Sequence, residues 1–260
     1  MNRDSSGVIE KILPRKNYIS RKAPKIKGAG KRGERLEQVV AANIDNLVIV
    51  SSAQSPKFNN RLIDRLIVTG ESSHLSVIIV INKIDLDESN EINIWSNLYE
   101  QIGYRVFSTS VKELIGLADL KKALHGTSSL IWGQSGVGKS SLINEMYPGI
   151  NLKIGEISNF TSKGKHTTVT SIMKKIERDT FIIDTPGIRE IDPYGIRKED
   201  LGHYFIEFLA YQESCRFNTC THYHEPGCAV ISAVEEGKIS GERYRSYLNI
   251  LETVEDDMNF

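Results

Sequence analysis

The chain has 260 residues, with 33 basic and 33 acidic side chains that give a formal net charge of zero. Its composition, 40% hydrophobic and 25% charged, is typical of a globular protein with one large domain or two modest ones. It has no apolar run long enough to cross a bilayer, and its first residues lack the apolar stretch of a signal peptide. These features argue against a membrane protein or an exported one, and we expect a cytoplasmic protein.

The N-terminal region is basic. The segment "GVIEKIL" (7–13) is a predicted strand, and "KIKGAGKRGER" (25–35) is a basic connector. Ten Lys or Arg and a single acid, Glu34, fall between Lys11 and Arg35, whereas the last nine residues carry four acids and no base. Such asymmetry is typical of a nucleic-acid-binding end and an acidic tail. A flexible basic linker is the alternative for the N-terminal region.

The middle of the chain alternates between short apolar runs and amphipathic segments. Strands are predicted at 46–52, 75–82, 105–110 and 127–133. Helices are predicted at 59–71, where we expect Gly70 to end the helix, and at 88–104, 116–126 and 138–147. This alternation predicts βαβ units, and hence a mainly parallel sheet with helices on both faces.

The pattern changes in the last third of the chain. Residues 156–170 are polar and rich in Gly, Ser and Thr, which predicts a mobile loop. Residues 170–187 predict two strands joined by a turn near Arg178 and Asp179. Helical stretches follow beyond about residue 198, around a cluster of cysteines, and no further βαβ unit is evident.

The segment "GQSGVGKSS" fits the phosphate-loop pattern G-x-x-x-x-G-K-[ST] between a predicted strand and a predicted helix. Glycines let the backbone wrap a phosphate, so that N–H groups and a helix N-terminus point at it. Lys139 is expected to bridge the terminal phosphates, and the Ser140 hydroxyl to bind Mg²⁺. The predicted nucleotide-binding residues here are Gly133, Gln134, Ser135, Gly136, Val137, Gly138, Lys139, Ser140 and Ser141. The alternative is a surface loop rich in Gly and Ser.

A second nucleotide element is "FIIDTPG", where an apolar strand ends at Asp184. The Asp184 carboxylate suits a direct or water-mediated Mg²⁺ contact, and the Gly187 N–H suits a hydrogen bond to the γ-phosphate. The D-x-x-G pattern is weak alone, but its place at a strand end downstream of a phosphate loop strengthens it.

The segment "NKID" also ends a predicted strand. Asp85 can accept hydrogen bonds from the N1–H and the exocyclic amine of guanine, a pattern that adenine cannot satisfy. Asn82 can meet the other edge of the base, and the alkyl stem of Lys83 can lie across the ring. Ser108, in the "STS" at 108–110, can add contacts to the base. A chance N-K-x-D match is the alternative, and the presence of the other nucleotide motifs makes it less probable.

The cysteines all lie in "CRFNTCTHYHEPGC". Cys215, Cys220 and Cys228, with His222, have the spacing C-x4-C-x-H-x5-C, which suits a closed tetrahedral site for structural zinc. His224 is an alternative fourth ligand. Free structural cysteines, or a catalytic zinc with an open position, are the competing interpretations.

The guanine reader precedes the phosphate loop, which is the reverse of the usual order in GTPases. With "NKID" (82–85), "GQSGVGKSSLIN" (133–144), "GKHTT" (164–168), "DTPGIRE" (184–190) and the cysteine cluster, the chain resembles the circularly permuted GTPases of the RsgA/YjeQ family over residues from about 35 to 240. A circular permutation leaves the strand ends unchanged in space, so the sites still meet at the carboxyl edge of the sheet.

The resemblance implies how catalysis works. Ile188 stands where Ras-like enzymes carry a glutamine that orients water, and a hydrophobic residue there is what the family carries. The family suggests His166 as the water-positioning catalytic residue and Thr167 or Thr168 as a further Mg²⁺ ligand. Lys139 of the phosphate loop is the other expected catalytic residue. A solvated loop histidine is the alternative for His166. Slow intrinsic hydrolysis, stimulated by the 30S subunit, is expected.

The resemblance also implies an architecture. We expect a partial OB-fold remnant with a basic linker at 1–35, a circularly permuted GTPase domain of α/β class at 36–198 and a helical zinc-binding domain at 199–260. The family spacing favours His222 over His224 as the ligand of one structural Zn²⁺. Arg243 and Arg245 are candidates for RNA contacts, although a solvated helix face is the simpler interpretation.

The expected function is a GTP hydrolase, with Mg²⁺ as cofactor, that assists late maturation of the 30S subunit and contacts its rRNA. We expect a monomer that binds GTP and GDP. One alternative is a guanine-nucleotide-dependent rRNA-binding assembly factor with negligible turnover. An ATP-dependent kinase or ATPase is the other, and Asp85 argues against it.

Overall fold

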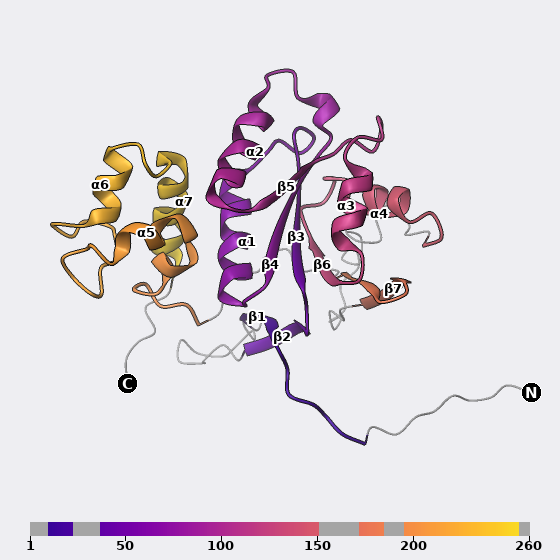
Figure 1. Ribbon diagram of the computed structural model, residues 1–260, viewed down its shortest axis with the longest axis horizontal. Coiled ribbons are helices and arrows are strands. Elements are labelled where there is room, and N and C mark those ends of the chain that lie inside the picture. Colours follow the sequence, from indigo (N-terminus) through magenta and orange to yellow (C-terminus); the bar gives the residue numbers. More distant parts are fainter. Residues whose placement is uncertain (1–9, 23–36, 151–171, 185–194, 255–260) are drawn as a thin grey trace, which may run out of the picture.

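The computed structural model describes residues 10–22, 37–150, 172–184 and 195–254 (Figure 1). The expected catalytic and switch residues His166, Thr167, Thr168, Gly187 and Ile188 lie outside these ranges. No helix in the described ranges is long and apolar enough to cross a membrane.

The centre of the structure is a six-stranded sheet with the order β5-β4-β3-β6-β8-β7. Five strands run parallel, and the edge strand β7 pairs antiparallel with β8. The strands are β3 (Asn46–Ser52), β4 (Ser76–Asn82), β5 (Arg105–Ser108), β6 (Ser128–Trp132), β7 (Ile172–Glu177) and β8 (Thr180–Asp184). The predicted mainly parallel sheet is confirmed.

Helices cover both faces of this sheet, as predicted. Those on one face are α1 (Asn60–Ser72) and α2 (Glu91–Ile102), and those on the other are α3 (Leu117–Leu124) and α4 (Lys139–Met146) (Figure 1). The side chains of Leu47 and Ile49 point to the first pair, and those of Val48 and Val50 point to the second. This alternation along one strand explains its uninterrupted apolar sequence, because both faces are buried.

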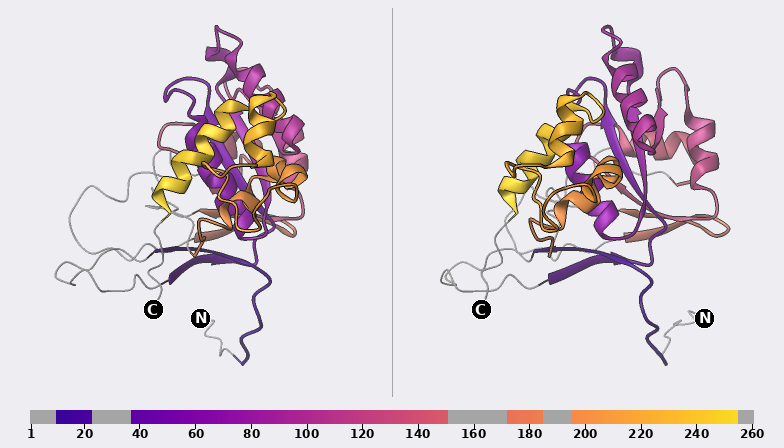
Figure 2. Two further views of the ribbon diagram at one scale, coloured as in Figure 1. Left: turned by 90° about the vertical axis from the view of Figure 1, so that its left-hand side faces the viewer. Right: turned by 60° about the vertical axis from the view of Figure 1, so that its left-hand side comes forward.

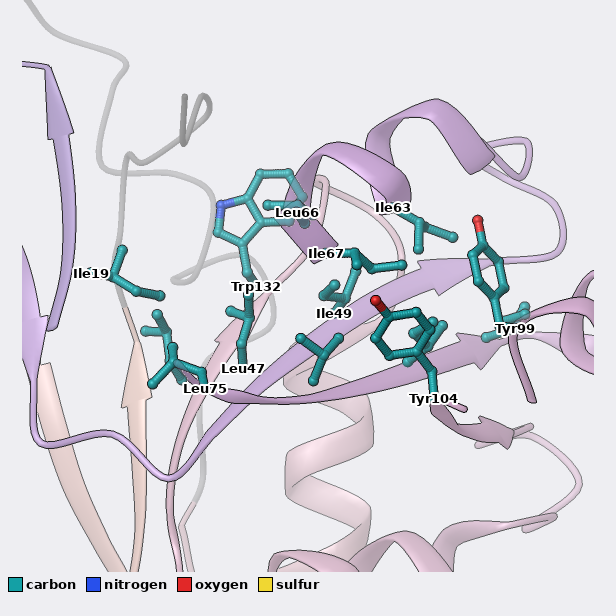
Figure 3. Packing of buried hydrophobic residues seen from close by; sticks show 14 of the residues in the cluster. Ile19, Leu47, Ile49, Ile63, Leu66, Ile67, Leu75, Tyr99, Tyr104 and Trp132 are labelled. Atoms are coloured by element: carbon teal, nitrogen blue, oxygen red, sulfur yellow. The ribbon is translucent and has the colours of Figure 1, made fainter. Parts of the chain in front are cut away.

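The core between the sheet and helices α1 and α2 consists of apolar side chains from both the strands and the helices. Ile63, Leu66 and Ile67 of α1 lie over Leu47 and Ile49 of β3, with Trp132 and Tyr99 beside them (Figure 3). The three α1 residues are at most 1% exposed. Their i, i+3, i+4 spacing is the reason that this segment forms a helix lying on the sheet.

Gly70 does not end α1, because the helix continues to Ser72. A Cβ at Gly70 would lie 2.5 Å from Cγ2 of Val77 and 3.2 Å from Cδ2 of Leu47. The glycine therefore serves close helix-to-sheet contact, and the helix ends where the Ser73 N–H caps the carbonyls of Thr69 and Gly70.

A two-stranded antiparallel sheet lies below the main one. It consists of β1 (Tyr18–Lys22) and β2 (Glu37–Ala42) (Figure 2). Ile19 of β1 is fully buried in the main core (Figure 3). The predicted strand at 7–13 is wrong in its described part, since residues 10–13 are exposed and form no strand. No strand pairs with them there to satisfy their backbone groups. β1 falls in the expected barrel remnant and β2 in the expected GTPase domain.

The C-terminal region is helical, as predicted, and packs beside α1 (Figure 2). It contains the short 3-10 turns η2 (Leu201–Tyr204) and η3 (Ile206–Phe208) and the helices α5 (Leu209–Gln212), α6 (Ala229–Glu235) and α7 (Gly241–Thr253). The expectation that Arg243 faces solvent or RNA is wrong, because its side chain is 0% exposed and bound to two carboxylates. Arg245 is exposed and pairs with Glu242.

Replacing Gly70 by Ala tests the close approach of α1 to the sheet. We expect Gly70→Ala to lower the free energy of unfolding, because overpacking of about 1–3 kcal/mol exceeds the helix-propensity gain of about 1 kcal/mol. Gly241→Ala, at the start of α7 with nothing within 4 Å of the added Cβ, is the matched control and should not destabilise the protein. Urea denaturation measures both, and equal midpoints for Gly70→Ala and the parent would contradict the packing argument.

Candidate functional site

The carboxyl ends of neighbouring strands bring the predicted nucleotide elements together. Ser52, which ends β3, is in register with Asn82, which ends β4. Ile131 of β6, just before the phosphate loop, is in register with Asp184 at the end of β8. Segments far apart in the sequence therefore meet at one edge of the sheet, where α/β proteins bind their ligands.

The phosphate loop connects β6 to α4 in a backbone path that its glycines require. Gly136 and Gly138 have φ values of 87° and 97°, in the region that favours glycine. A Cβ at Gly138 would also lie 2.4 Å from the amide nitrogen Nδ2 of Asn82. Only glycine allows the loop to lie this close to the "NKID" segment.

Lys139 and Ser140 occupy the first turn of α4. The ammonium of Lys139 donates to the carbonyls of Gly133 at 2.6 Å and Gln134 at 2.8 Å, so it lies back over the loop. Both residues are largely buried, while Gln134, Ser135 and Gly136 are exposed. The helix N-terminus and the ammonium together form a site suited to an anion.

The carboxamide of Asn82 is a junction between three segments. It is 2% exposed, its Nδ2 donates to the carbonyl of Val137 at 2.9 Å, and its Oδ1 accepts from the hydroxyl of Thr109 at 3.1 Å. The "NKID" segment is thereby attached both to the phosphate loop and to the segment after β5.

Lys83 joins two more backbone segments. Its residue adopts a left-handed conformation with φ of 60°, and its Nζ donates to the carbonyl of Gly136 at 2.6 Å and to that of Ser55. Ser55 belongs to the loop between β3 and α1. The ammonium of Lys83 thereby links the "NKID" segment to the phosphate loop and to the loop after β3.

Asp85 is oriented by hydroxyl and ammonium groups. Its Oδ1 accepts from the hydroxyl of Ser110 at 2.6 Å, and its Oδ2 lies 4.0 Å from Nζ of Lys112. Its side chain is 7% exposed. A shielded carboxylate held in one orientation can discriminate between bases by their hydrogen-bond donors.

The "STS" segment divides its hydroxyls between two directions. Thr109 contacts Asn82 and Ser110 contacts Asp85, whereas the hydroxyl of Ser108 lies 3.3 Å from that of Ser96 in α2. The structure therefore does not bring the Ser108 hydroxyl to the carboxylate of Asp85. The sequence has three adjacent hydroxyl residues at 108–110. Because β5 ends at Ser108, only the hydroxyls of Thr109 and Ser110 contact the "NKID" segment.

The switch side of the site is described only in part. The backbone of Asp184 ends β8 beside β6, which carries the phosphate loop. The predicted residues Gly187, His166, Thr167 and Thr168 lie outside the described ranges.

The four predicted metal ligands come together in the C-terminal region. The ligand atoms of Cys215, Cys220, His222 and Cys228 all lie within 4.8 Å of one another. Sγ of Cys215 is 3.9 Å from Sγ of Cys228, and Nδ1 of His222 lies 3.7 Å and 3.4 Å from these two sulfurs. Tetrahedral zinc with Zn–S bonds of about 2.3 Å places ligand atoms roughly 3.5–3.8 Å apart. The donor set and its spacing fit such an ion.

Burial favours the uncharged forms of the groups in this cluster. It raises the pKa of the Cys220 thiol to about 12 and lowers the pKa of His222. Thiolate and neutral imidazole are the forms that bind metal, so a divalent ion would displace the thiol protons. The exposed His224 lies outside the cluster, which supports His222 as the fourth ligand.

Neighbouring side chains fix the loop that carries the ligands. The hydroxyls of Tyr244 and Tyr247 in α7 donate to the carbonyls of His222 at 2.7 Å and Thr221 at 2.5 Å. Glu225 accepts from the backbone and the hydroxyl of Thr221 and from the backbone of Tyr223. Burial of Glu225 opposes ionisation, but these hydrogen bonds outweigh it and lower its pKa to about 2.

Comparison with known proteins gives consistent matches. The pattern of the RsgA GTPase family matches residues 12–194. The small ribosomal subunit biogenesis GTPase RsgA of Chlorobaculum parvum is 41% identical over 252 residues, which cover 97% of this chain and 80% of the relative. RsgA 2 of Bacteroides thetaiotaomicron is 40% identical over 259 residues, covering 98% and 81%.

Two solved structures resemble the chain. YjeQ from Thermotoga maritima has a TM-score of 0.75 and 32% identity, covering 96% of this chain and 79% of its own. YloQ, described as a circularly permuted GTPase, has a TM-score of 0.72 and 30% identity, covering 100% and 79%.

Removing one thiol tests the metal site. We expect Cys220→Ser to lower metal affinity by at least about 100-fold, since losing even a supporting hydrogen bond of a ligand typically costs 10–100-fold. Metal content after purification and colorimetric metal release would measure this. His224→Ala is the control and should keep the metal. Full metal content in Cys220→Ser would contradict the assignment.

Proposed function

The chain belongs to the RsgA GTPase family, and from this membership we propose that it hydrolyses GTP to assist late maturation of the 30S ribosomal subunit. It is a circularly permuted GTPase. The observation that carries the proposal is the contact of "NKID" with the phosphate loop, made by Asn82 to Val137 and by Lys83 to Gly136. The proposed guanine reader and the proposed phosphate site are therefore in direct contact although their order along the chain is reversed.

We propose that Asp85 binds the N1–H and the exocyclic amine of guanine. Ser110 holds one carboxylate oxygen at 2.6 Å, so the carboxylate meets the base in a fixed orientation. Lys83, anchored at both carbonyls, supports the ring face, and Asn82 fixes the distance between base and phosphate subsites. An adenine base would leave the Asp85 carboxylate without its donors.

The phosphates are proposed to lie over the loop and the start of α4. Backbone N–H groups of the loop bind the phosphates. The ammonium of Lys139, which donates to the carbonyls of Gly133 and Gln134 in this structure, would donate to the β- and γ-phosphates instead. Ser140 and Asp184 hold the Mg²⁺ that comes with GTP, and Gly187 binds the γ-phosphate. The parallel pairing of β6 with β8 supports this placement of Asp184.

Catalysis is proposed to use His166 in place of the glutamine of Ras-like enzymes, because Ile188 cannot orient water. Thr167 or Thr168 would be a further ligand of the Mg²⁺ that accompanies GTP. Turnover is slow until the 30S subunit binds.

Beyond the nucleotide site, one structural Zn²⁺ is proposed at Cys215, Cys220, His222 and Cys228. The ion would hold the ligand loop in the position that the two tyrosine hydroxyls also fix. The basic residues between 11 and 35 are proposed to contact rRNA phosphates. The protein would act in the cytoplasm as a monomer.

Phosphate release with and without purified 30S subunits tests the function directly. We expect hydrolysis to rise by at least about 100-fold with the subunit, which is within the range that partners produce in other GTPases. Turnover that stays near background with 30S, despite nucleotide-dependent binding to it, would instead support an assembly factor with negligible hydrolysis.

His166→Ala tests the proposed water-positioning residue. The stimulated rate should fall by about 100-fold or more, while GTP affinity stays unchanged, because the imidazole acts on water rather than on the nucleotide. His125→Ala, an exposed histidine after α3, is the control. An unchanged stimulated rate in His166→Ala would overturn the assignment.

Asp85→Asn tests the guanine reader. We expect GTP affinity to fall by at least about 100-fold and xanthosine triphosphate to become the preferred nucleotide, since the amide donates where the carboxylate accepted. Fluorescent nucleotide titration measures both affinities. Glu88→Gln removes an exposed charge three positions away and should leave both affinities unchanged. Retention of guanine preference in Asp85→Asn would contradict the proposal.

A further inference from the structure

A buried ion cluster joins the metal-binding region to the GTPase sheet. Arg243 of α7 donates from Nη1 to Oδ1 of Asp64 in α1 at 2.5 Å. Its Nε and Nη2 donate to the two carboxylate oxygens of Glu207 in η3 at 2.7 and 3.1 Å. The side chains of Arg243 and Asp64 are both 0% exposed. A guanidinium bound to carboxylates on two sides fixes both the distance and the orientation of α7 on α1.

Aromatic rings enclose this cluster. The guanidinium carbon of Arg243 lies 4.6 Å from the ring centroid of Phe205 and 5.9 Å from that of Tyr99. The hydroxyl of Tyr99 in α2 donates to the same Asp64 oxygen that Arg243 contacts, at 2.8 Å. Asp64 therefore ties α1, α2 and α7 together, and water is excluded from the contact.

Packed rings lead from this cluster to the nucleotide site. Tyr99 lies 6.1 Å from Trp95 between ring centroids, and Trp95 lies 5.5 Å from Phe58. Phe58 lies near the end of the short loop between β3 and α1, the loop whose Ser55 carbonyl accepts from Lys83. The position of α1 and of this loop thus sets one of the two anchors of the lysine beside the guanine reader.

On its other side, α7 is attached to the metal loop. Tyr244 follows Arg243 directly and donates to the carbonyl of the ligand His222, and Tyr247 donates to that of Thr221. The ring of Phe208 meets the His222 imidazole edge-on at 5.9 Å. Helix α7 therefore contacts both the ligand loop and the ion cluster, through the consecutive residues Tyr244 and Arg243.

We propose that Arg243 is a positioning residue that couples metal binding at the cysteine cluster to guanine-nucleotide binding at "NKID". The inference rests on the proposed function of both sites. A bound metal fixes the ligand loop, the loop fixes α7, and Arg243 transmits that position to α1, α2 and the Ser55 loop. By linkage, the metal then strengthens nucleotide binding, and nucleotide strengthens metal binding by the same factor.

Equilibrium zinc occupancy, measured in a series of chelator-buffered free zinc concentrations with and without saturating GDP, tests the coupling in the intact chain. In the parent protein we expect GDP to lower the free zinc needed for half occupancy by about 10-fold, within the usual range for linked sites. In Arg243→Met this shift should disappear although zinc and GDP each still bind. Arg245→Met, on the exposed side of the same helix, is the matched control and should keep the full shift.

The outcomes separate the inference from the proposed function. A parent protein that binds no zinc, or no GDP, would overturn the function on which the inference rests. A parent that binds both without any shift, or an Arg243→Met protein that keeps the parent's shift, would overturn the coupling alone.

Arg243→Met leaves two carboxylates without their partner, and circular dichroism will tell whether it folds. Tyr99→Phe provides the second variant, because it removes only the hydroxyl on Asp64 and keeps the ring against Trp95. We expect it to reduce the GDP-induced shift from about 10-fold to about threefold. A parent-sized shift in Tyr99→Phe, where Arg243→Met does not fold, would overturn the proposal.

Discussion

The carboxamide of Asn82 is the contact on which the nucleotide site depends. It is buried, it donates to the phosphate loop and it accepts from Thr109, so three loops from three strand ends are fixed to one side chain. A buried amide left without either partner would carry the full cost of its lost hydrogen bonds. The close approach that this contact needs in turn restricts Gly138 to glycine. The arrangement in which these loops meet therefore depends on one residue at the end of β4.

This dependence explains why the reversed order of the motifs does not disturb the site. The contacts of Asn82 and Lys83 are made between strand ends, and strand ends are placed by the sheet order and not by the connections. β3 and β4 precede β6 in the chain, but in the sheet β3 lies directly between β4 and β6. Both faces of β3 and β4 are buried. A permuted chain needs the same apolar runs and the same glycines, and these are what the sequence displays.

The sequence predicted those features that are local and missed those that depend on partners. The strands and helices of the sheet, the phosphate loop and the metal ligands each have a recognisable spacing. The structure confirms the strands and helices, and it brings the four predicted metal ligands together. The pairing of β1 with β2, the close contact at Gly70 and the hydrogen bond from Ser110 to Asp85 all depend on which segment lies opposite. The roles of His166, Thr167, Thr168 and Gly187 remain predictions, since they lie outside the described residues.

Arg243 illustrates the limit best. On a helix rich in charged residues, its neighbour Arg245 is exposed, and nothing in the spacing separates the two. Burial is set by Asp64, far away in the chain, and by Glu207, whose carboxylates replace the hydration that the guanidinium loses. Apolar side chains of similar volume could fill this space at no loss of stability, so stability alone does not account for the cluster. The ion cluster makes the packing of α7 directional. A guanidinium that is hydrogen-bonded to carboxylates on two sides allows one orientation of α7, whereas an apolar contact would allow several.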